Sequence, residues 1–334
     1  MTAWQRVRQW LVARRRFEFV LILSVVIGLT AAGGALVLLP KAAVSRVNPM
    51  PASSTEATLD PDPQIAELRR VMESYGPVVT RHVEGADGRL STVLGHPGQR
   101  DDIETLAREV GPAVTNVTGL WGRDWSQRAV VTIASGTAEF AALTHATGTV
   151  SSGVAAASVS DPFVPGNRPT GQRVVFSEQA GRRLGADGMR ETLRHELTHV
   201  AARAQTIDGS PQWVLEGFAE YSARRADHAP FARDAPVLTA RARSGDLPAD
   251  LPGDPAFVPT TGNDAELAYE QAWSANAYVA DRFGEPKLVE LYRRMATGPK
   301  DAHALDDALG TCLGVRHGDF VTDWQDWIRS RIAS

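Results

Sequence analysis

The 334-residue sequence contains a single cysteine, Cys312, so no disulfide bond can form within the chain. It also contains no internal repeat and no cluster of cysteines, which excludes repeat architectures and cysteine-based metal centres. Beyond the first residues, acidic residues outnumber basic ones: the net charge is −4, and residues 1–18 carry five arginines and one glutamate. The rest of the chain is therefore acidic, which argues against nucleic acid as a partner.

Composition is that of a folded protein. Hydrophobic residues make up 43% of the chain and charged residues 22%, which is enough for one sizeable globular domain with a small addition. Cys312 lies near a C-terminal helical segment, and a small buried core residue is the favoured interpretation of it.

A twenty-residue segment without charge, Val20 to Leu39, follows the N-terminal arginines. As a helix it would rise about 30 Å, the thickness of the hydrocarbon core of a bilayer. The arginines predict a cytoplasmic N-terminus over residues 1–19 and an extracytoplasmic location for everything after residue 40. A cleavable signal peptide is the alternative, because small residues occur at Ala31 to Ala35. The segment is longer than a signal-peptide core, which favours an uncleaved anchor in the lipid bilayer.

Composition divides the remainder into three parts. Residues 40–63 hold five prolines among Ser, Thr and Ala, which predicts a flexible linker. Residues 64–99 predict a small lead-in element, and residues 100–334 the main folded domain. Periodicity predicts helices at 65–74, 103–110, 138–144, 189–203, 265–282, 286–295 and 319–332, and strands at 78–83, 90–94, 129–134, 150–159 and 173–177. The pattern indicates an α+β fold, with a small mixed sheet followed by a mainly helical C-terminal half.

The most informative segment is His195-Glu196-Leu197-Thr198-His199. Residues four apart share one face of a helix, so both imidazoles can bind one ion while Glu196 projects beside them. Catalytic zinc takes three protein ligands and keeps an open position for water, whose proton Glu196 can accept. Glu216, seventeen residues after His199, is the natural third ligand.

The segment around Glu216 predicts a second helix. Pro211 suits its first turn, with Ser210 as the cap. Glu220 lies four residues after Glu216 and therefore on the same face, where its carboxylate can accept the free N–H of a zinc-bound histidine.

These two motifs, with Trp213-Val214-Leu215-Glu216-Gly217-Phe218-Ala219-Glu220-Tyr221 as the second, resemble those of the gluzincin zinc metallopeptidases. The likeness is to the peptidase MA-like branch found in bacterial envelope proteins, and it extends over about residues 100–332. It implies a thermolysin-like fold, one Zn²⁺ held by His195, His199 and Glu216, Glu196 as the base and Glu220 behind a ligand. Aminopeptidases of the wider group carry Asn where this chain has Leu215, so the resemblance does not extend to aminopeptidase activity.

Two further parts of the site are predicted from the resemblance. In the gluzincin pattern, an edge strand lies beside the substrate cleft and pairs with the extended substrate. Gly153 to Val159 is the candidate for this strand, and the alternative is an ordinary strand packed within the sheet. A donor for the developing oxyanion is also needed, and Tyr269 is the first choice, with Tyr278 and His228 as alternatives.

The sequence thus predicts a single-pass membrane protein with an extracytoplasmic zinc metallopeptidase domain acting on a peptide or protein substrate. Two alternatives stay open: a zinc-containing envelope binding protein without activity, and a metal-dependent amidase acting on a cell-wall peptide. Glu196 favours hydrolysis over binding alone, because metal retention does not need it.

Overall fold

The computed structural model describes residues 62–146, 154–164, 167–227, 229–258 and 264–333. The expected cytoplasmic N-terminus, the membrane segment at residues 20–39 and nearly all of the linker lie outside these residues. Within the described part of the chain, every helix is too short or too polar to cross a bilayer.

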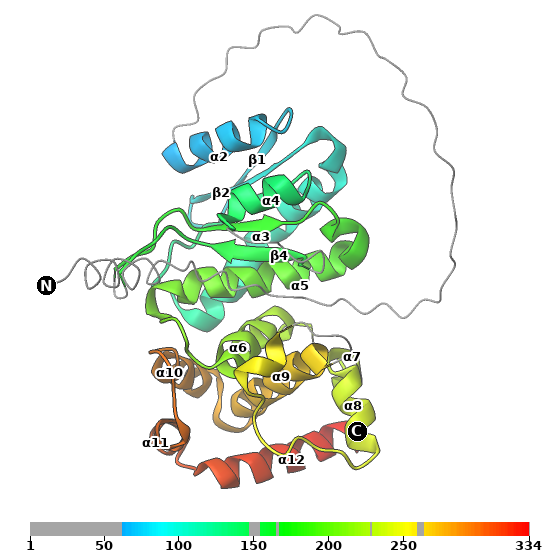
Figure 1. Ribbon diagram of the computed structural model, residues 1–334, viewed down its shortest axis with the longest axis vertical. Helices are drawn as coiled ribbons and strands as arrows, with labels where there is room; N and C mark the ends of the chain where they lie inside the picture. The colour runs from blue at the N-terminus through cyan, green and yellow to red at the C-terminus, as the bar shows by residue number, and fades with distance from the viewer. Residues whose placement is uncertain (1–61, 147–153, 165–166, 228, 259–263, 334) are drawn as a thin grey trace, which may run out of the picture.

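A five-stranded mixed sheet forms the N-terminal half (Figure 1). Its strands are β1 (Val79–Glu84), β2 (Leu90–Gly95), β3 (Val130–Ile133), β4 (Ala156–Val159) and β5 (Arg173–Phe176), in the order β1-β2-β3-β5-β4. The three central strands run parallel, whereas β1 and β4 are antiparallel to their neighbours and form the two edges. The expected mixed sheet is confirmed, and β4 is an edge strand.

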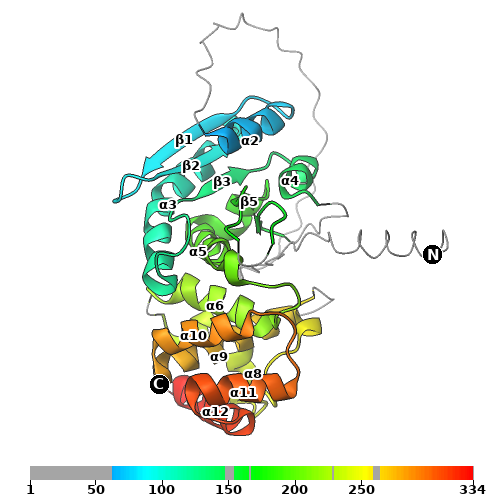
Figure 2. The ribbon, with the colours of Figure 1, turned by 90° about the vertical axis from the view of Figure 1, so that its left-hand side faces the viewer.

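Helices cover both faces of the sheet. On one face lie α2 (Pro63–Glu73) and α4 (Thr137–Thr144), and on the other α3 (Arg100–Trp121) and α5 (Ala180–Ala202) (Figure 2). Alternation along the strands divides the core: Val93, Val131 and Val174 pack toward α3 and α5, while Leu94 and Val175 pack toward α2 and α4. Apolar side chains at alternating strand positions therefore bury both faces of the sheet.

The C-terminal half is helical. It contains α6 (Gln212–Arg224), α7 (Phe231–Asp234), α8 (Pro236–Arg243), α9 (Asp264–Phe283), α10 (Glu285–Met295), α11 (Ala302–Leu313) and α12 (His317–Ala333), with the short 3₁₀ helix η3 (Asp254–Phe257). Two further 3₁₀ helices precede this half: η1 (Pro97–Gln99), between β2 and α3, and η2 (Arg203–Gln205), directly after α5. One hydrophobic core runs from the lower face of the sheet through α5 and α6 to α12. In Figure 1, α5 and α6 consequently lie between the sheet half and the helices α9 to α12.

Two features differ from the sequence expectation. The helix expected at 103–110 continues to Trp121 through Pro112, because Ala113, Val117 and Leu120 bury the following turns and offset the missing backbone donor. Residues 64–99, expected as a separate lead-in element, supply β1 and β2 to the same sheet as β3, β4 and β5. The strand expected at 150–159 is present as β4, and residues 150–153 lie outside the described part.

Candidate metal centre

The first two candidate ligands lie on the buried second half of α5. Leu193 and Leu197 pack into the core between α5 and the sheet. His195 and His199 lie on the same helical face as each other, 1% and 3% exposed. Their ring nitrogens Nε2 are 3.1 Å apart, which confirms that the four-residue spacing directs both imidazoles to one point.

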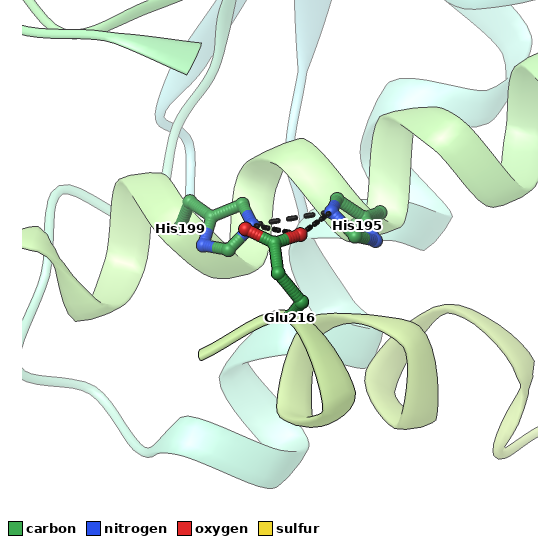
Figure 3. Close-up of side chains that lie close together, drawn as sticks. All are labelled: His195, His199 and Glu216. Atoms are coloured by element: carbon green, nitrogen blue, oxygen red, sulfur yellow. Dashed lines mark hydrogen bonds and ion pairs between the residues drawn. The ribbon is translucent and has the colours of Figure 1, made fainter. Parts of the chain in front are cut away.

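The third candidate ligand comes from α6. Glu216 is 1% exposed, and its Oε2 lies 3.3 Å from Nε2 of His195 and 3.7 Å from Nε2 of His199 (Figure 3). One donor atom from each of the three side chains lies within 4.8 Å of the other two. Residues seventeen positions apart in the sequence are therefore brought to one buried centre by the packing of α6 on α5.

The start of α6 differs from the prediction. Ser210 is not its cap: the hydroxyl of Ser210 donates to the carbonyl of Ile207 and accepts from the backbone N–H of Gly298. Pro211 occupies the cap position, and the N–H of Gln212 donates to Asp254 in η3 at 2.8 Å. Asp254, which is distant in sequence, therefore accepts from the first N–H of α6. Ser210 instead links the loop at Ile207 to the loop at Gly298.

Gly217 sets how closely α6 approaches α9. A Cβ at this position would overlap the side-chain amide of Asn276 and the backbone of Ala272. The same amide donates to the carbonyl of Trp213, at 3.1 Å, and to that of Ala272. The glycine beside Glu216 thus permits the helix contact that fixes the position of the carboxylate.

A second carboxylate lies behind His195. Oε1 of Glu220 is 3.1 Å from Nδ1 of His195, the ring nitrogen that faces away from the centre. The other oxygen, Oε2, forms an ion pair with the guanidinium of Arg224 one turn further along α6. This is the geometry expected for an outer carboxylate that fixes the tautomer and orientation of a ligand histidine.

Charge within the centre favours a cation. Burial lowers the pKa of His195, but the carboxylates of Glu216 and Glu220 outweigh this and raise it to about 10. Burial raises the pKa of Glu216, but His199 and His195 outweigh this and lower it to about 2. Buried carboxylates that stay ionised beside imidazoles offer negative charge that a divalent ion can neutralise.

Glu196 is fully buried and has a different environment. Neither of its carboxylate oxygens has a hydrogen-bond partner of acceptable geometry among the described residues, and the same holds for Oε2 of Glu216. Burial raises the pKa of Glu196, against the opposing effect of His195 and His199. Unpaired buried carboxylate oxygens are rare and costly, and they mark a place where an ion, a water molecule or a substrate belongs.

The residues fit zinc. Two imidazoles and one carboxylate are a donor set that zinc uses in catalytic sites. Oε2 of Glu216 has long ion-pair contacts to the two histidines but no hydrogen bond of acceptable geometry among the described residues, which leaves it able to bind a cation. The carboxylate of Glu220, 3.1 Å from Nδ1 of His195, supports this ligand from behind and completes the arrangement.

Of the residues predicted as oxyanion donors, two lie on α9. Tyr269 is 9% exposed on α9, with its ring edge against Phe257 at 5.2 Å between centroids. Tyr278, also on α9, packs its ring against that of Phe320 in α12. His228 lies outside the described residues.

Sequence reasoning missed Arg224. The signal was present, because an arginine four residues after Glu220 on a helix can pair with it. Arg224 also lies 3.9 Å from Glu191 of α5, so it joins the two helices that carry the site.

Comparisons with known proteins give limited help. No protein-family model and no curated protein matches the sequence. Among solved structures, the M1 zinc metallopeptidase from Deinococcus radiodurans is similar, with 14% identity and a TM-score of 0.43 over 76% of this chain and 52% of that one. A point mutant of that enzyme bound to a Tyr-Ser-Ala substrate matches with 14% identity and a TM-score of 0.39, over 77% and 53%. The chain spans about half the length of these structures, and TM-scores below 0.5 do not establish a shared fold, so the assignment of the centre rests on its own geometry.

Proposed function

We propose that this protein is a zinc metallopeptidase that hydrolyses peptide bonds. The observation that carries the proposal is the buried convergence of His195, His199 and Glu216, with Glu196 beside them and its oxygens unpaired. A centre that only retained a metal would need the first three residues and would gain nothing from burying Glu196.

Each side chain has a role in this proposal. His195, His199 and Glu216 hold the ion, and Glu220 orients His195. Zinc bound there would lower the pKa of a water molecule toward about 7 and polarise the carbonyl under attack. Glu196 takes the proton of the attacking water on its carboxylate and then transfers it to the leaving amine. Burial raises the pKa of Glu196, which makes its carboxylate a stronger proton acceptor.

Tyr269 is proposed to donate a hydrogen bond to the oxyanion that develops at the attacked carbonyl. The support is its place on α9, the helix that packs against α6. Removal of such a donor typically costs several kcal/mol of transition-state stabilisation. Tyr269→Phe should therefore lower kcat by about 100-fold or more while zinc content stays unchanged.

The anchor is proposed from the sequence alone. The arginine-flanked apolar run at residues 20–39 supports a single-pass protein of the bacterial cytoplasmic membrane with the centre outside. The full-length chain should stay in the membrane fraction after an alkaline wash, and a reporter fused after Ser334 should be active only when exported. A shorter soluble form beginning near Ala42 would establish the signal-peptide alternative.

The test of the proposed activity uses the full-length chain in detergent. Wild type and Glu196→Gln are incubated with a broad peptide library, products are identified by mass spectrometry, and zinc is measured by elemental analysis. Glu196→Gln keeps the shape of the side chain but removes the base, so hydrolysis should fall by roughly two to four orders of magnitude with zinc retained. Glu73→Gln, which alters an exposed carboxylate on α2, is the control and should behave as wild type.

Two outcomes would overturn the proposal. Equal cleavage by wild type and Glu196→Gln would remove Glu196 from the mechanism. If wild type cleaves nothing while Glu196→Gln restores function to a deletion strain, the protein is a zinc-containing binding protein. Cleavage confined to cell-wall peptides would identify an amidase with the same chemistry.

A further inference from the structure

A small pocket adjoins the metal centre on the side of the edge strand. It is lined by the side chains of His199 and Arg203, by Ser158 and Ser160 at the end of β4, and by Gln172 before β5. Arg203 follows His199 by four residues, the interval that separates His199 from His195, so the guanidinium emerges beside the ligand nearest the pocket.

Arg203 is the one permanently charged side chain among the described residues that line this pocket. Its side chain is 18% exposed, and the guanidinium stacks over the ring of Phe163 at 4.5 Å. The remaining lining side chains are hydroxyl, amide, imidazole or aliphatic groups. The pocket is therefore positive, next to a centre whose other charges are mostly carboxylates.

The guanidinium is incompletely neutralised. One nitrogen, Nη1, donates to the carbonyl of Thr206 at 2.7 Å. The nearest carboxylate described, Asp208, is 3.7 Å from Nη2 and 57% exposed, so water screens it. A largely buried cation whose ion pair is 3.7 Å long and screened by water is costly, and burial lowers the pKa of Arg203. A ligand carboxylate would meet a planar fork of N–H donors that suits it geometrically.

We infer that Arg203 makes the enzyme selective for peptides that carry a carboxylate close to the scissile bond. The inference rests on the proposed function, because it assigns a substrate class to the same centre. Lying one helical turn from His199, the guanidinium would contact the residue beside the bond being cleaved. Two sources of the carboxylate are chemically equivalent there: an Asp or Glu side chain, and the C-terminal carboxylate of a short peptide.

The experiment compares matched peptides on full-length protein. One pair differs by Glu against Gln next to the cleaved bond in an amidated peptide, and a second pair differs by a free against an amidated C-terminus. A hydrogen-bonded charge pair predicts about a ten- to hundredfold higher kcat/KM for the carboxylate member of the pair that reaches Arg203. Arg203→Gln should abolish that preference, and Arg203→Lys should keep part of it.

A binding measurement separates this inference from the proposed function. The dissociation constants of the same peptides are measured with zinc-loaded Glu196→Gln, alone and combined with Arg203→Gln. Tighter binding of carboxylate peptides that is lost with Arg203→Gln supports the inference even if no wild-type cleavage is detected. Arg316→Gln, which removes an arginine 83% exposed at the start of α12, is the control and should retain the preference.

Equal cleavage and equal binding of carboxylate and amide peptides by wild type would overturn the inference while leaving the peptidase intact. A preference that survives in both Arg203→Gln and Arg203→Lys would also overturn it, since the selectivity would then lie elsewhere. Preference in the first peptide pair alone identifies an acidic side chain as the ligand, and preference in the second pair alone identifies the C-terminus.

Discussion

Two buried groups of histidine and glutamate lie in opposite layers of the molecule: the pair His96 and Glu139 between β2 and α4, and the cluster of His195, His199 and Glu216 between α5 and α6. In the first, Nε2 of His96 lies 3.0 Å from both carboxylate oxygens of Glu139, and Nδ1 lies 2.9 Å from the carbonyl of Pro77. Glu139 also accepts from the backbone and hydroxyl of Ser135, at 2.6 Å each. Every polar side-chain atom of this pair has a partner.

The second cluster contains the same residue types, but its polar atoms are arranged differently. The Nε2 atoms of His195 and His199 converge on Oε2 of Glu216, an atom without a hydrogen bond of acceptable geometry in the described part of the chain. Burial alone therefore does not distinguish a structural pair from a ligand site. The difference is whether the polar atoms form hydrogen bonds with each other or converge on a common point where one ion can bind all of them.

The largest effect should come from Glu216→Ala. This change removes one of three candidate ligands, so zinc affinity should fall by more than the loss expected for a supporting residue, and purified protein should contain less than stoichiometric zinc. Elemental analysis of protein prepared without chelator measures the outcome. Full zinc content in Glu216→Ala would break the comparison, because Glu216 would then be no more a ligand than Glu139.

The next effect concerns the satisfied pair. His96→Ala leaves Glu139 buried without its ring partner, and breaking a buried pair costs about 3–5 kcal/mol of unfolding free energy. Zinc content should not change. Denaturant unfolding measures the loss, and a double variant, His96→Leu with Glu139→Leu, should recover much of it because no charge is left buried. Loss of zinc in folded His96→Ala would contradict the separation of the two clusters.

Glu220→Gln should have an intermediate effect on the metal. The amide keeps one oxygen near Nδ1 of His195 but loses the charge that pairs with Arg224. Supporting residues of this kind typically contribute 10- to 100-fold to metal affinity, to be measured here by competition with a coloured chelator. A loss as large as that of Glu216→Ala would mean that the two carboxylates exchange roles.

The smallest effect is expected from Gly217→Ala. The added methyl group must displace Asn276 or the backbone of Ala272, and overpacking of this kind costs about 1–3 kcal/mol. Thermal unfolding measures it. Gly310→Ala in α11 is the matched control, because its Cβ would meet no atom within 4 Å, and it should leave stability unchanged or raise it by up to about 1 kcal/mol. Equal behaviour of the two variants would show that α6 and α9 can separate freely.

Local patterns predicted most of the elements. Period-two and helical repeats gave β3, β5, α4, α9 and α10 to within a residue or two, because those segments bury one face or both. The helices α8 and α11 escaped prediction, since each buries only three of its residues. Helix α3 was underestimated because Pro112 reads locally as a stop, whereas the core packing of the turns beyond it outweighs the lost hydrogen bond.

For the centre itself, the sequence determined the pair His195 and His199, because a four-residue interval on a helix fixes their common face without help from the rest of the chain. It also determined the identity of Glu196, Glu216 and Glu220 as candidates. Only the tertiary structure decided how they meet. The approach of α6 to α5 depends on Gly217 against α9, on Asp254 at the start of α6 and on Arg224 between the helices, contacts whose partners are remote in sequence. Likewise, His96 and Glu139 carry no motif, and only their complete set of hydrogen bonds in the folded protein identifies them as structural.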